Sequence, residues 1–164
     1  MEVIGYKCFN KDLTNRYGMK FEVGKTYADN GIIRFGDKGH GFHMCERLED
    51  TLRYFDAMNG QVSICLVKGS GTIVEEYDDF NGYYNMYSAS VLEIIKELSR
   101  DEIIDMAILF NEIRVERFLS CFRLNDYEIS LFKDKFVNNY SVISYIGYYQ
   151  ENDYNAFKKK VKLK

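Results

Sequence analysis

The fold is decided by the stretch Gly39-His40-Gly41-Phe42-His43-Met44-Cys45-Glu46, which contains both histidines of the chain. A glycine-rich turn leads into apolar Phe42 and Met44, which alternate with polar His43, and this alternation predicts a half-buried strand. The apolar residues that follow recur at helical spacing and predict a helix over Arg47–Met58. The stretch therefore predicts a corner where a strand turns into a helix, and such a corner is the best candidate site in the sequence.

Strand-forming residues precede this corner. We expect a first strand at residues 2–9 and two further strands at residues 21–27 and 32–35. The triplet Asp29-Asn30-Gly31 between the last two predicts that they pair as a hairpin.

More strand-forming residues follow the corner. Val62–Gly69 is apolar and β-branched, which is typical of a central strand. The triplet Gly69-Ser70-Gly71 predicts a turn into another strand at residues 72–77, and residues 78–85 predict an exposed loop. Residues 86–98 fit either a strand or a helix, and we favour a strand through Ile95.

The apolar period changes to helical at Asp101. A first helix is expected to end at Asn125-Asp126, and a second covers Tyr127–Val137. The stretch Tyr140–Tyr149 is apolar on most sides, so it either packs against the sheet or forms an interface with a protein partner or a second copy.

Together these patterns predict an α+β protein. We expect a twisted, mostly antiparallel sheet domain over residues 1–100 and a helical C-terminal extension over residues 101–164 that packs on it. The length of 164 residues leaves no room for a second full domain.

The composition is that of a globular protein without strong charge. Apolar residues make up 46% of the chain, aromatic residues 16%, and the formal net charge is −3. This charge gives no general attraction to nucleic acid or to an acidic membrane. The exception is Lys158–Lys164, which holds five lysines. We expect a solvated tail there, and the alternative is a phosphate-binding arm for nucleic acid.

The spacing of the cysteines and the lack of long apolar runs indicate the cellular compartment. The four cysteines are far apart and form no CxxC pair, no hydrophobic leader follows Met1, and no apolar run approaches the roughly 20 residues of a membrane span. We therefore expect a cytoplasmic protein with reduced thiols and no membrane partner.

Metal binding is one chemistry that the corner could carry. His40, His43 and Cys45 are ligand types for zinc, and Cys8 or Cys65 could complete a set of four. However, His43 and Cys45 would share a strand face while His40 lies across the glycine turn. We favour two hydrogen-bonded histidines and expect no metal.

Nucleophilic catalysis is a second chemistry. Cys45 could pair with His43 or His40, with Glu46 or Asp50 as the orienting group. Side chains two apart on a strand point the same way without usually sharing a hydrogen bond, so we favour a buried, unreactive thiol. The acidic residues near the predicted loop could also bind a cation or act as a general base, but we favour a solvated loop. These residues are Glu75, Glu76, Asp78 and Asp79.

The corner also resembles part of a known enzyme family. Gly39 to Cys45, followed nine residues later by Tyr54-Phe55, resembles the Gly-x-Gly-Ile-Tyr-Phe-Ala strand and following helix of the poly- and mono-ADP-ribosyltransferases. Residues 64–69 resemble the next core strand of that fold. The resemblance implies an ADP-ribosyltransferase-like sheet and an enzyme that uses NAD.

This resemblance also assigns residues to a pocket. It implies that the NAD-binding residues are Tyr6, Lys7, His43 and Tyr54. His43 stands where the family has the tyrosine that stacks on nicotinamide. Met86 stands where it has the catalytic glutamate, and a thioether cannot stabilise positive charge that develops in a transition state. The implied enzyme is therefore degenerate, and Glu93 would replace the glutamate only if the strands align differently.

A second resemblance covers more of the chain, roughly residues 4–106. Four segments resemble, in the same order, motifs of an uncharacterised bacterial and prophage domain that often precedes pentapeptide-repeat-like arrays. The segments are Gly5-Tyr6-Lys7-Cys8-Phe9, residues 21–27, Gly41 to Glu46 and Ser88-Ala89-Ser90. This resemblance implies an origin in phage or mobile DNA but no defined activity.

From both resemblances we expect a small binding protein without a required cofactor. Its partner would be a host or phage protein, and inhibition of a host protein is one form that this function could take. The alternative is the NAD-dependent mono-ADP-ribosyltransferase-like enzyme. Self-association through the helical third is a further expectation.

Overall fold

The computed structural model describes residues 1–78 and 84–151, which fall into two compact units. The sheet unit consists of Met1–Asp56 and Gln61–Ser99. The helical unit consists of Ala57–Gly60 and the chain from Arg100 onward. The chain thus crosses between the units three times, after Asp56, Gly60 and Ser99. The predicted loop tip at residues 79–83 and the lysine-rich tail at 158–164 lie outside the described residues.

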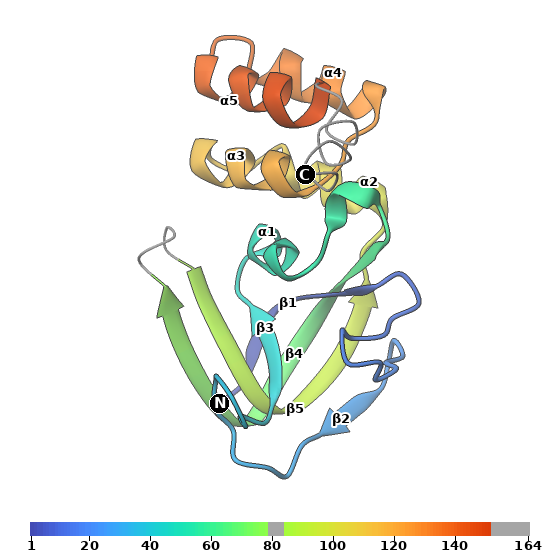
Figure 1. Ribbon diagram of the computed structural model, residues 1–164, viewed down its shortest axis with the longest axis vertical. Helices are drawn as coiled ribbons and strands as arrows, with labels where there is room; N and C mark the ends of the chain where they lie inside the picture. Colours follow the sequence, from blue (N-terminus) through green and yellow to red (C-terminus); the bar gives the residue numbers. More distant parts are fainter. Residues whose placement is uncertain (79–83, 152–164) are drawn as a thin grey trace, which may run out of the picture. The chain divides into compact units, whose positions relative to one another are not determined.

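The sheet unit is a five-stranded antiparallel sheet that closes on itself (Figure 1). Its strand order is β2-β5-β3-β1-β4, and β4 also pairs with β5, so four of the strands form a ring. This architecture confirms the predicted α+β class with a mostly antiparallel sheet and C-terminal helices. The strands are β1 (Val3–Asn10), β2 (Thr26–Ala28), β3 (Phe42–Cys45), β4 (Val62–Asp78) and β5 (Tyr84–Glu97).

The ring is closed unevenly. β1 pairs with β4 along its whole length, from Val3 opposite Gly69 to Asn10 opposite Val62. On its other edge, β1 pairs with β3 at one position, Tyr6 opposite Cys45. We call this second contact the β1–β3 seam. Away from that pair the two strands separate, and space opens between them.

The interior of the ring is a cluster of apolar side chains contributed by strands and by the loop after β1. Phe21, from that loop, packs with its ring tilted against Phe9 and Tyr27, at centroid distances of 5.0 Å and 4.8 Å. Such aromatic contacts fix the loop against the sheet. The buried members of the cluster are Phe9, Phe21, Phe42, Met44, Cys65, Val67, Leu92 and Ile94.

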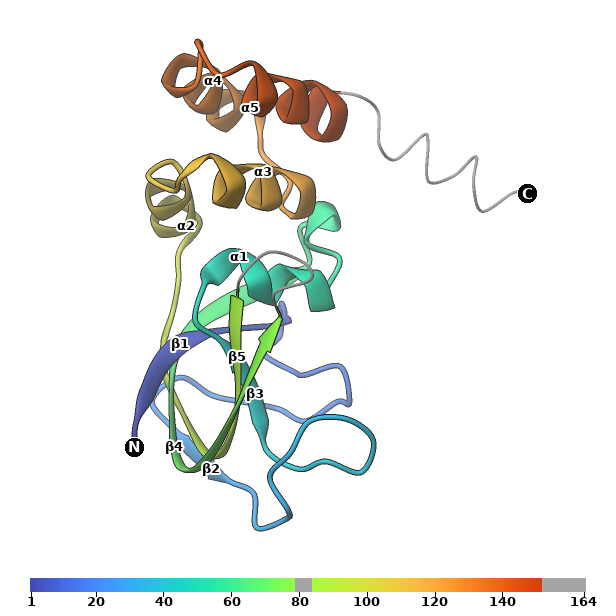
Figure 2. The same ribbon diagram turned by 90° about the vertical axis from the view of Figure 1, so that its left-hand side faces the viewer.

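The strand-to-helix corner forms as predicted, but its helix is short. Phe42 and Met44 are buried and His43 is exposed, which is the expected alternation. α1 covers Leu48–Thr51 and continues as the 3-10 turn η1 (Leu52–Tyr54). The predicted helix over Arg47–Met58 is wrong in length because Phe55 has extended backbone angles (φ −136°, ψ 152°). In both ribbon views α1 lies at one end of the ring (Figures 1 and 2).

The predicted hairpin around Asp29-Asn30-Gly31 is wrong. β2 pairs with β5, from Thr26 opposite Glu93 to Ala28 opposite Val91. The Asp29 carboxylate accepts a hydrogen bond from the amide of Gly41 as well as from Gly31, which ties this turn to the glycine-rich segment instead of folding it back on β2. Residues 32–35 form no strand beyond an isolated bridge from Ile33 to His40.

The predicted turn at Gly69-Ser70-Gly71 is also wrong, because β4 runs through it. The pairing of β4 with β5 shifts register between Ser70 and Ile73, and Gly71 has a φ of +76° there. These are the marks of a β-bulge, which bends a strand without ending it. The predicted strand over residues 86–95 is confirmed, since β5 spans Tyr84–Glu97. Glu75 and Glu76 lie on β4, exposed, and Asp79 lies outside the described residues.

As far as Glu151, where the described residues end, the helical unit contains the short turn η2 (Ala57–Asn59) and five C-terminal elements. The one helix predicted from Asp101 to Asn125 is two, because Asn111 caps a new helix with its side chain. The predicted break at Asn125-Asp126 is confirmed, and Asn125 forms a capping box with Glu128. The five elements are α2 (Arg100–Ala107), α3 (Glu112–Cys121), α4 (Asp126–Lys135), α5 (Tyr140–Tyr145) and the π-helix η3 (Ile146–Glu151).

Gln150, on η3, holds the end of α3 in place. Its side chain is buried, accepts a hydrogen bond from the Leu124 amide at 2.9 Å, and donates to the carbonyls of Leu119 (2.5 Å) and Phe122 (2.8 Å). It therefore satisfies backbone groups that the end of a helix leaves without partners. Within the described part of the chain, no helix is long and apolar enough to cross a membrane.

Candidate functional site

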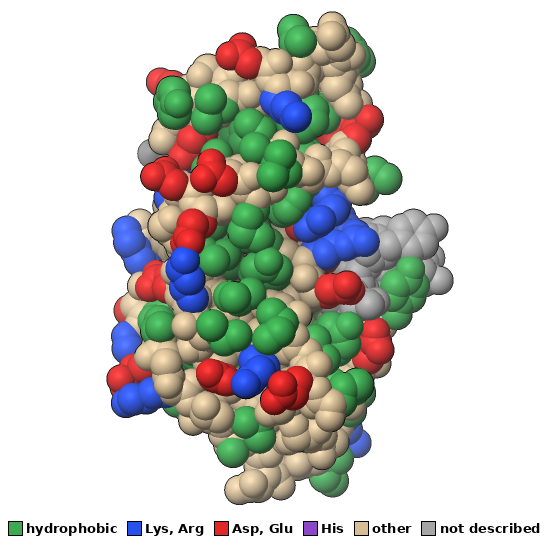
Figure 3. Space-filling model, turned by 180° about the vertical axis from the view of Figure 1, so that it is seen from behind, with side chains coloured by type: hydrophobic (Ala, Val, Ile, Leu, Met, Phe, Trp, Pro, Cys, Tyr) green, Lys and Arg blue, Asp and Glu red, His purple; other side chains and the backbone are tan. Residues whose placement is uncertain are grey.

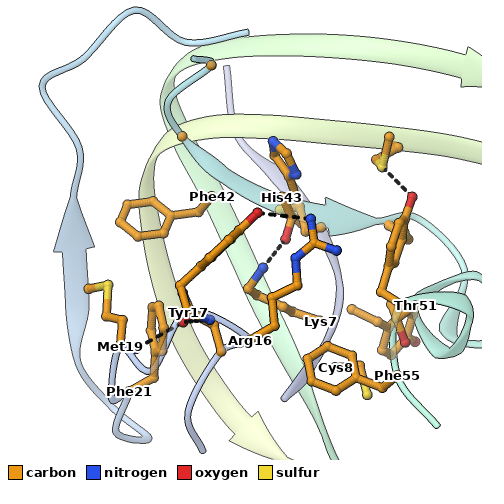
Figure 4. A pocket seen from close by; sticks show the side chains of 18 of the residues that line it. Lys7, Cys8, Arg16, Tyr17, Met19, Phe21, Phe42, His43, Thr51 and Phe55 are labelled. Atoms are coloured by element: carbon orange, nitrogen blue, oxygen red, sulfur yellow. Dashed lines mark hydrogen bonds between the residues drawn. The ribbon is translucent and has the colours of Figure 1, made fainter. Parts of the chain in front are cut away.

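A cavity of about 530 Å³ opens in the sheet unit beside the β1–β3 seam (Figure 4). Its walls come from β1, from the loop that follows β1, from the glycine-rich turn with β3, and from the end of α1 with η1. All four residues that the ADP-ribosyltransferase resemblance assigned to a pocket line it, namely Tyr6, Lys7, His43 and Tyr54. Met86 lines it as well.

The seam explains why these residues meet. Tyr6 and Lys7 stand on β1 at the position where it pairs with Cys45 of β3, and His43 stands two residues before that pair. Because β1 and β3 separate beyond the pair, the Lys7 side chain reaches across the gap, and its Nζ donates a hydrogen bond to the His43 carbonyl oxygen at 2.5 Å. A side chain thus bridges the strands where backbone pairing has ended.

Positive charge gathers at this bridge. Figure 4 shows the Arg16 guanidinium close to the hydrogen bond between Lys7 and the His43 carbonyl, and the Arg16 charge acts on both residues. Arg16 contacts its neighbour Tyr17, with its Nη2 2.9 Å from the phenol oxygen and its guanidinium 5.1 Å from the ring centroid. The His43 ring packs on Phe35, with 5.0 Å between centroids. Among the described residues, neither Lys7 nor Arg16 has a carboxylate within ion-pair distance.

The pKa values of Lys7 and His43 reflect this environment. The pKa of Lys7 is lowered to about 8, mainly by burial, with opposing effects of Cys45 and Cys8 and a smaller lowering effect of the Arg16 charge. Burial also lowers the pKa of His43, with added effects of Lys7 and Arg16. At pH 7, Lys7 is therefore mostly charged and His43 mostly neutral. The lining also holds the carboxylates of Asp29 and Asp37, but neither forms an ion pair with Lys7 or Arg16 among the described residues, so these cations can accept an anion.

The glycine-rich turn is organised by Asp29. Its carboxylate accepts hydrogen bonds from the amides of Gly31 (2.8 Å) and Gly41 (2.9 Å), and Nδ1 of His40 lies 3.0 Å away. The two amide hydrogen bonds are the main reason that the pKa of Asp29 is lowered. Although Asp29 lines the cavity, its oxygens are engaged by the turn. His40 is thereby directed to Asp29, apart from His43.

Another part of the cavity wall consists of aromatic rings and the thioether of Met86. The Tyr54 hydroxyl lies 3.0 Å from the sulfur of Met86, where the ADP-ribosyltransferase resemblance expects a glutamate. Phe55 and Phe42 also line the cavity. Glu93, the alternative carboxylate, does not line the cavity and pairs instead with Lys68 at 2.8 Å.

On the surface seen in Figure 3, acidic and basic side chains are interspersed.

The thiols near the cavity do not suit nucleophilic catalysis. Burial, and after it the neighbouring Asp50 charge, raise the pKa of Cys45 to about 12. Burial likewise raises the pKa of Cys8 and of Cys65 to about 12. Across residues 1–78 and 84–151, no group of three or more His, Cys, Asp and Glu side chains could hold a metal ion.

The sequence reasoning did not identify Arg16 and Tyr17 as site residues. They lie in the loop after β1, where no motif marks them and where the predicted turn gave no orientation. Their position depends on Asn15, whose side chain accepts hydrogen bonds from the amides of Tyr17 and Met19. An asparagine that organises its own loop in this way is a turn signal, and it could have suggested a rigid loop at this position.

Comparison with protein families places most of the chain in one of them. The family described as "Domain of unknown function (DUF7666)" matches residues 3–106, which agrees with the uncharacterised domain expected over roughly residues 4–106. The matched segment contains every residue named above as lining the cavity. Comparisons with curated proteins and with solved structures found no match. The chain therefore belongs, through residues 3–106, to the DUF7666 family.

Proposed function

We propose that the sheet unit is a ligand-binding module whose cavity takes a small organic anion with an aromatic part. The observation that carries this proposal is the convergence of Lys7 and Arg16 in one cavity without a carboxylate partner among the described residues. Two neighbouring cations repel each other, and an anion between them would turn that repulsion into two charge-assisted hydrogen bonds.

The rest of the cavity suits the remainder of such a ligand. A volume of about 530 Å³ lies within the range of small-molecule sites. Tyr17, Tyr54 and Phe55 provide ring faces and edges on which a planar group can stack. His43, mostly neutral at pH 7, can take up a proton when the anion binds beside it. A nucleoside monophosphate combines both features, so AMP is the probe of choice.

The test compares AMP with its two halves. Calorimetry on the full chain should show that AMP binds more tightly than adenosine, which lacks the phosphate, and than ribose 5-phosphate, which lacks the base. Arg16→Gln should weaken AMP binding by about ten- to a hundredfold, the value of a hydrogen bond to a charged group. Arg34→Gln, an exposed arginine that does not line the cavity, is the matched control and should bind as the unchanged protein does. Equal affinities for AMP and adenosine would contradict the proposal.

NAD is a second candidate ligand, supported by one observation. The residues that the resemblance assigned to NAD binding all line this cavity, and Lys7 and Arg16 could hold the diphosphate of NAD. NAD should then raise the melting temperature, and His43→Ala should abolish that rise. Release of nicotinamide in the presence of a protein or nucleic-acid acceptor would establish a transferase, whereas binding without release would leave a binding module.

The expectation of a protein partner or of self-association rests on a different surface. The helical unit exposes large apolar side chains on α3, on α4, on α5 and in the adjoining turns. Apolar side chains that adjoin one another on a surface mark interfaces, and this is the basis of the expectation. Among the described residues of this unit, the most exposed large apolar side chains are Tyr140 (87%), Leu109 (78%), Tyr127 (71%), Val137 (68%) and Ile113 (63%).

A further inference from the structure

Lys7 differs from the exposed lysines of the sheet unit in its position. Among the described residues it is the lysine that lines the cavity, and the hydrogen bond to the His43 carbonyl oxygen holds its amine at the cavity wall. By contrast, Lys11, Lys20 and Lys38 are exposed and do not line the cavity. A lysine amine that is desolvated beside a second cation is the usual arrangement for attack on a carbonyl carbon.

We propose that Lys7 captures the carbonyl group of an anionic aldehyde or 2-oxo acid as a reversible imine. The proposal rests on the proposed function, because Arg16 and His43 would bind the acid or phosphate group while the carbonyl carbon meets Nζ of Lys7. The ligand class is thus narrowed from organic anions to anions that carry a reactive carbonyl.

The reaction balances without a further reagent. The nitrogen lone pair of Lys7 forms a bond to the carbonyl carbon, and the carbonyl oxygen takes a proton to give a carbinolamine. That oxygen then leaves as water while the second carbon–nitrogen bond forms, with loss of a proton from nitrogen. The net change is amine plus carbonyl to imine plus water, so hydrolysis reverses it and no oxidant or reductant takes part.

The environment of Lys7 supports this chemistry near neutral pH. Its pKa of about 8 leaves part of the amine unprotonated at pH 7 to 8, whereas the ordinary pKa of a lysine is 10.5. The groups that act on its pKa are Arg16 in the loop, Cys45 on β3 and Cys8 on β1. The other charged and titratable side chains that line the cavity are His43, Asp29, Asp37, Tyr6, Tyr17 and Tyr54. Both thiols have pKa values near 12, so they are neutral in this range.

The test uses two probes that differ in one group. Pyridoxal 5′-phosphate carries an aldehyde and a phosphate, and pyridoxine 5′-phosphate has an alcohol in place of the aldehyde. The full chain is incubated with less than one equivalent of the aldehyde, the imine is reduced with sodium borohydride, and peptide mass spectrometry locates the adduct. We expect about tenfold or more adduct on Lys7 than on any exposed lysine, given the difference in pKa. Its yield should rise with pH through a midpoint near 8.

The outcomes separate this inference from the proposed function. The inference is supported if pyridoxine 5′-phosphate binds, competes with labelling, and the adduct maps to Lys7. If pyridoxine 5′-phosphate binds but Lys7 is labelled no faster than Lys11 and Lys20, the inference is overturned and the binding module stands. If neither probe binds while AMP does, the inference is overturned and the proposed function stands; if AMP also fails to bind, both fail. Lys7→Gln should lose the adduct and Lys11→Gln should keep it, and the site mapping in the unchanged protein decides the question even if Lys7→Gln does not fold.

Discussion

Gly41 is the residue at which the glycine-rich turn enters β3. Its φ is +107°, and a Cβ at this position would lie 2.3 Å from Oγ of Ser88 and 3.1 Å from Cγ2 of Ile33. Ser88 is fully buried and cannot move aside freely. The position therefore combines a backbone conformation that disfavours side chains with a lack of space.

We predict that Gly41→Ala lowers the free energy of unfolding by about 2–4 kcal/mol, the sum of backbone strain and overpacking. Gly18→Ala is the matched control, because Gly18 has a φ of +86° but a Cβ added there would meet no atom within 4 Å. It should cost about 1 kcal/mol, from strain alone. Denaturant unfolding of both variants measures the difference, and equal losses would show that the contact with Ser88 is unimportant.

At the residue scale, sequence identified part of the cavity. The alternation of Phe42, His43 and Met44 predicts which side chain leaves the core, and the structure agrees. The pocket residues themselves came from the ADP-ribosyltransferase resemblance, which named Tyr6, Lys7, His43 and Tyr54, and all four line the cavity. Arg16 could not be predicted, because its position depends on how the loop after β1 folds over the sheet, and no periodicity records that. The role of the cavity residues in binding stays a prediction.

At the element scale, sequence predicted strands better than it predicted their partners. The strands at β1, β4 and β5 follow from local composition. The hairpin at residues 29–31 and the turn at residues 69–71 were wrong for a common reason. Glycine and asparagine mark a change of backbone direction, but a bulge and a tied loop use the same residues as a tight turn. Whether β2 pairs with its neighbour or with β5 is decided by contacts distant in sequence.

The π-helix η3 allows a prediction at the same scale. Gln150→Leu keeps the size of the buried side chain but removes the hydrogen bonds to the Leu119 and Phe122 carbonyls and from the Leu124 amide. We expect a loss of about 2–4 kcal/mol in the free energy of unfolding, because buried polar groups would lose their partners. Glu151→Leu, at the next residue, removes an ion pair to Lys133 between partly exposed side chains and should cost about 1 kcal/mol or less. Chemical unfolding that gave the two variants the same stability would contradict this assignment.

At the scale of the whole molecule, the helical unit is the expected interface. If it mediates self-association, sedimentation velocity should show a dimer for the unchanged chain and a monomer for the double variant Ile113→Ser, Tyr140→Ser. Ile32→Ser is the control, since Ile32 is 73% exposed but lies in the sheet unit, and it should leave the dimer intact. A chain that stays monomeric at all concentrations would exclude self-association.

The segment Ala57–Gly60 constrains how this chain can be rearranged. It belongs to the helical unit although its neighbours on both sides belong to the sheet unit. Ala57 and Met58 are buried, and the Ala57 carbonyl accepts a hydrogen bond from the Arg123 amide at 3.4 Å. The helical unit is therefore not a cassette that recombination could exchange with a single crossover after Ser99. A new C-terminal half would have to fit four residues that the recipient gene already encodes.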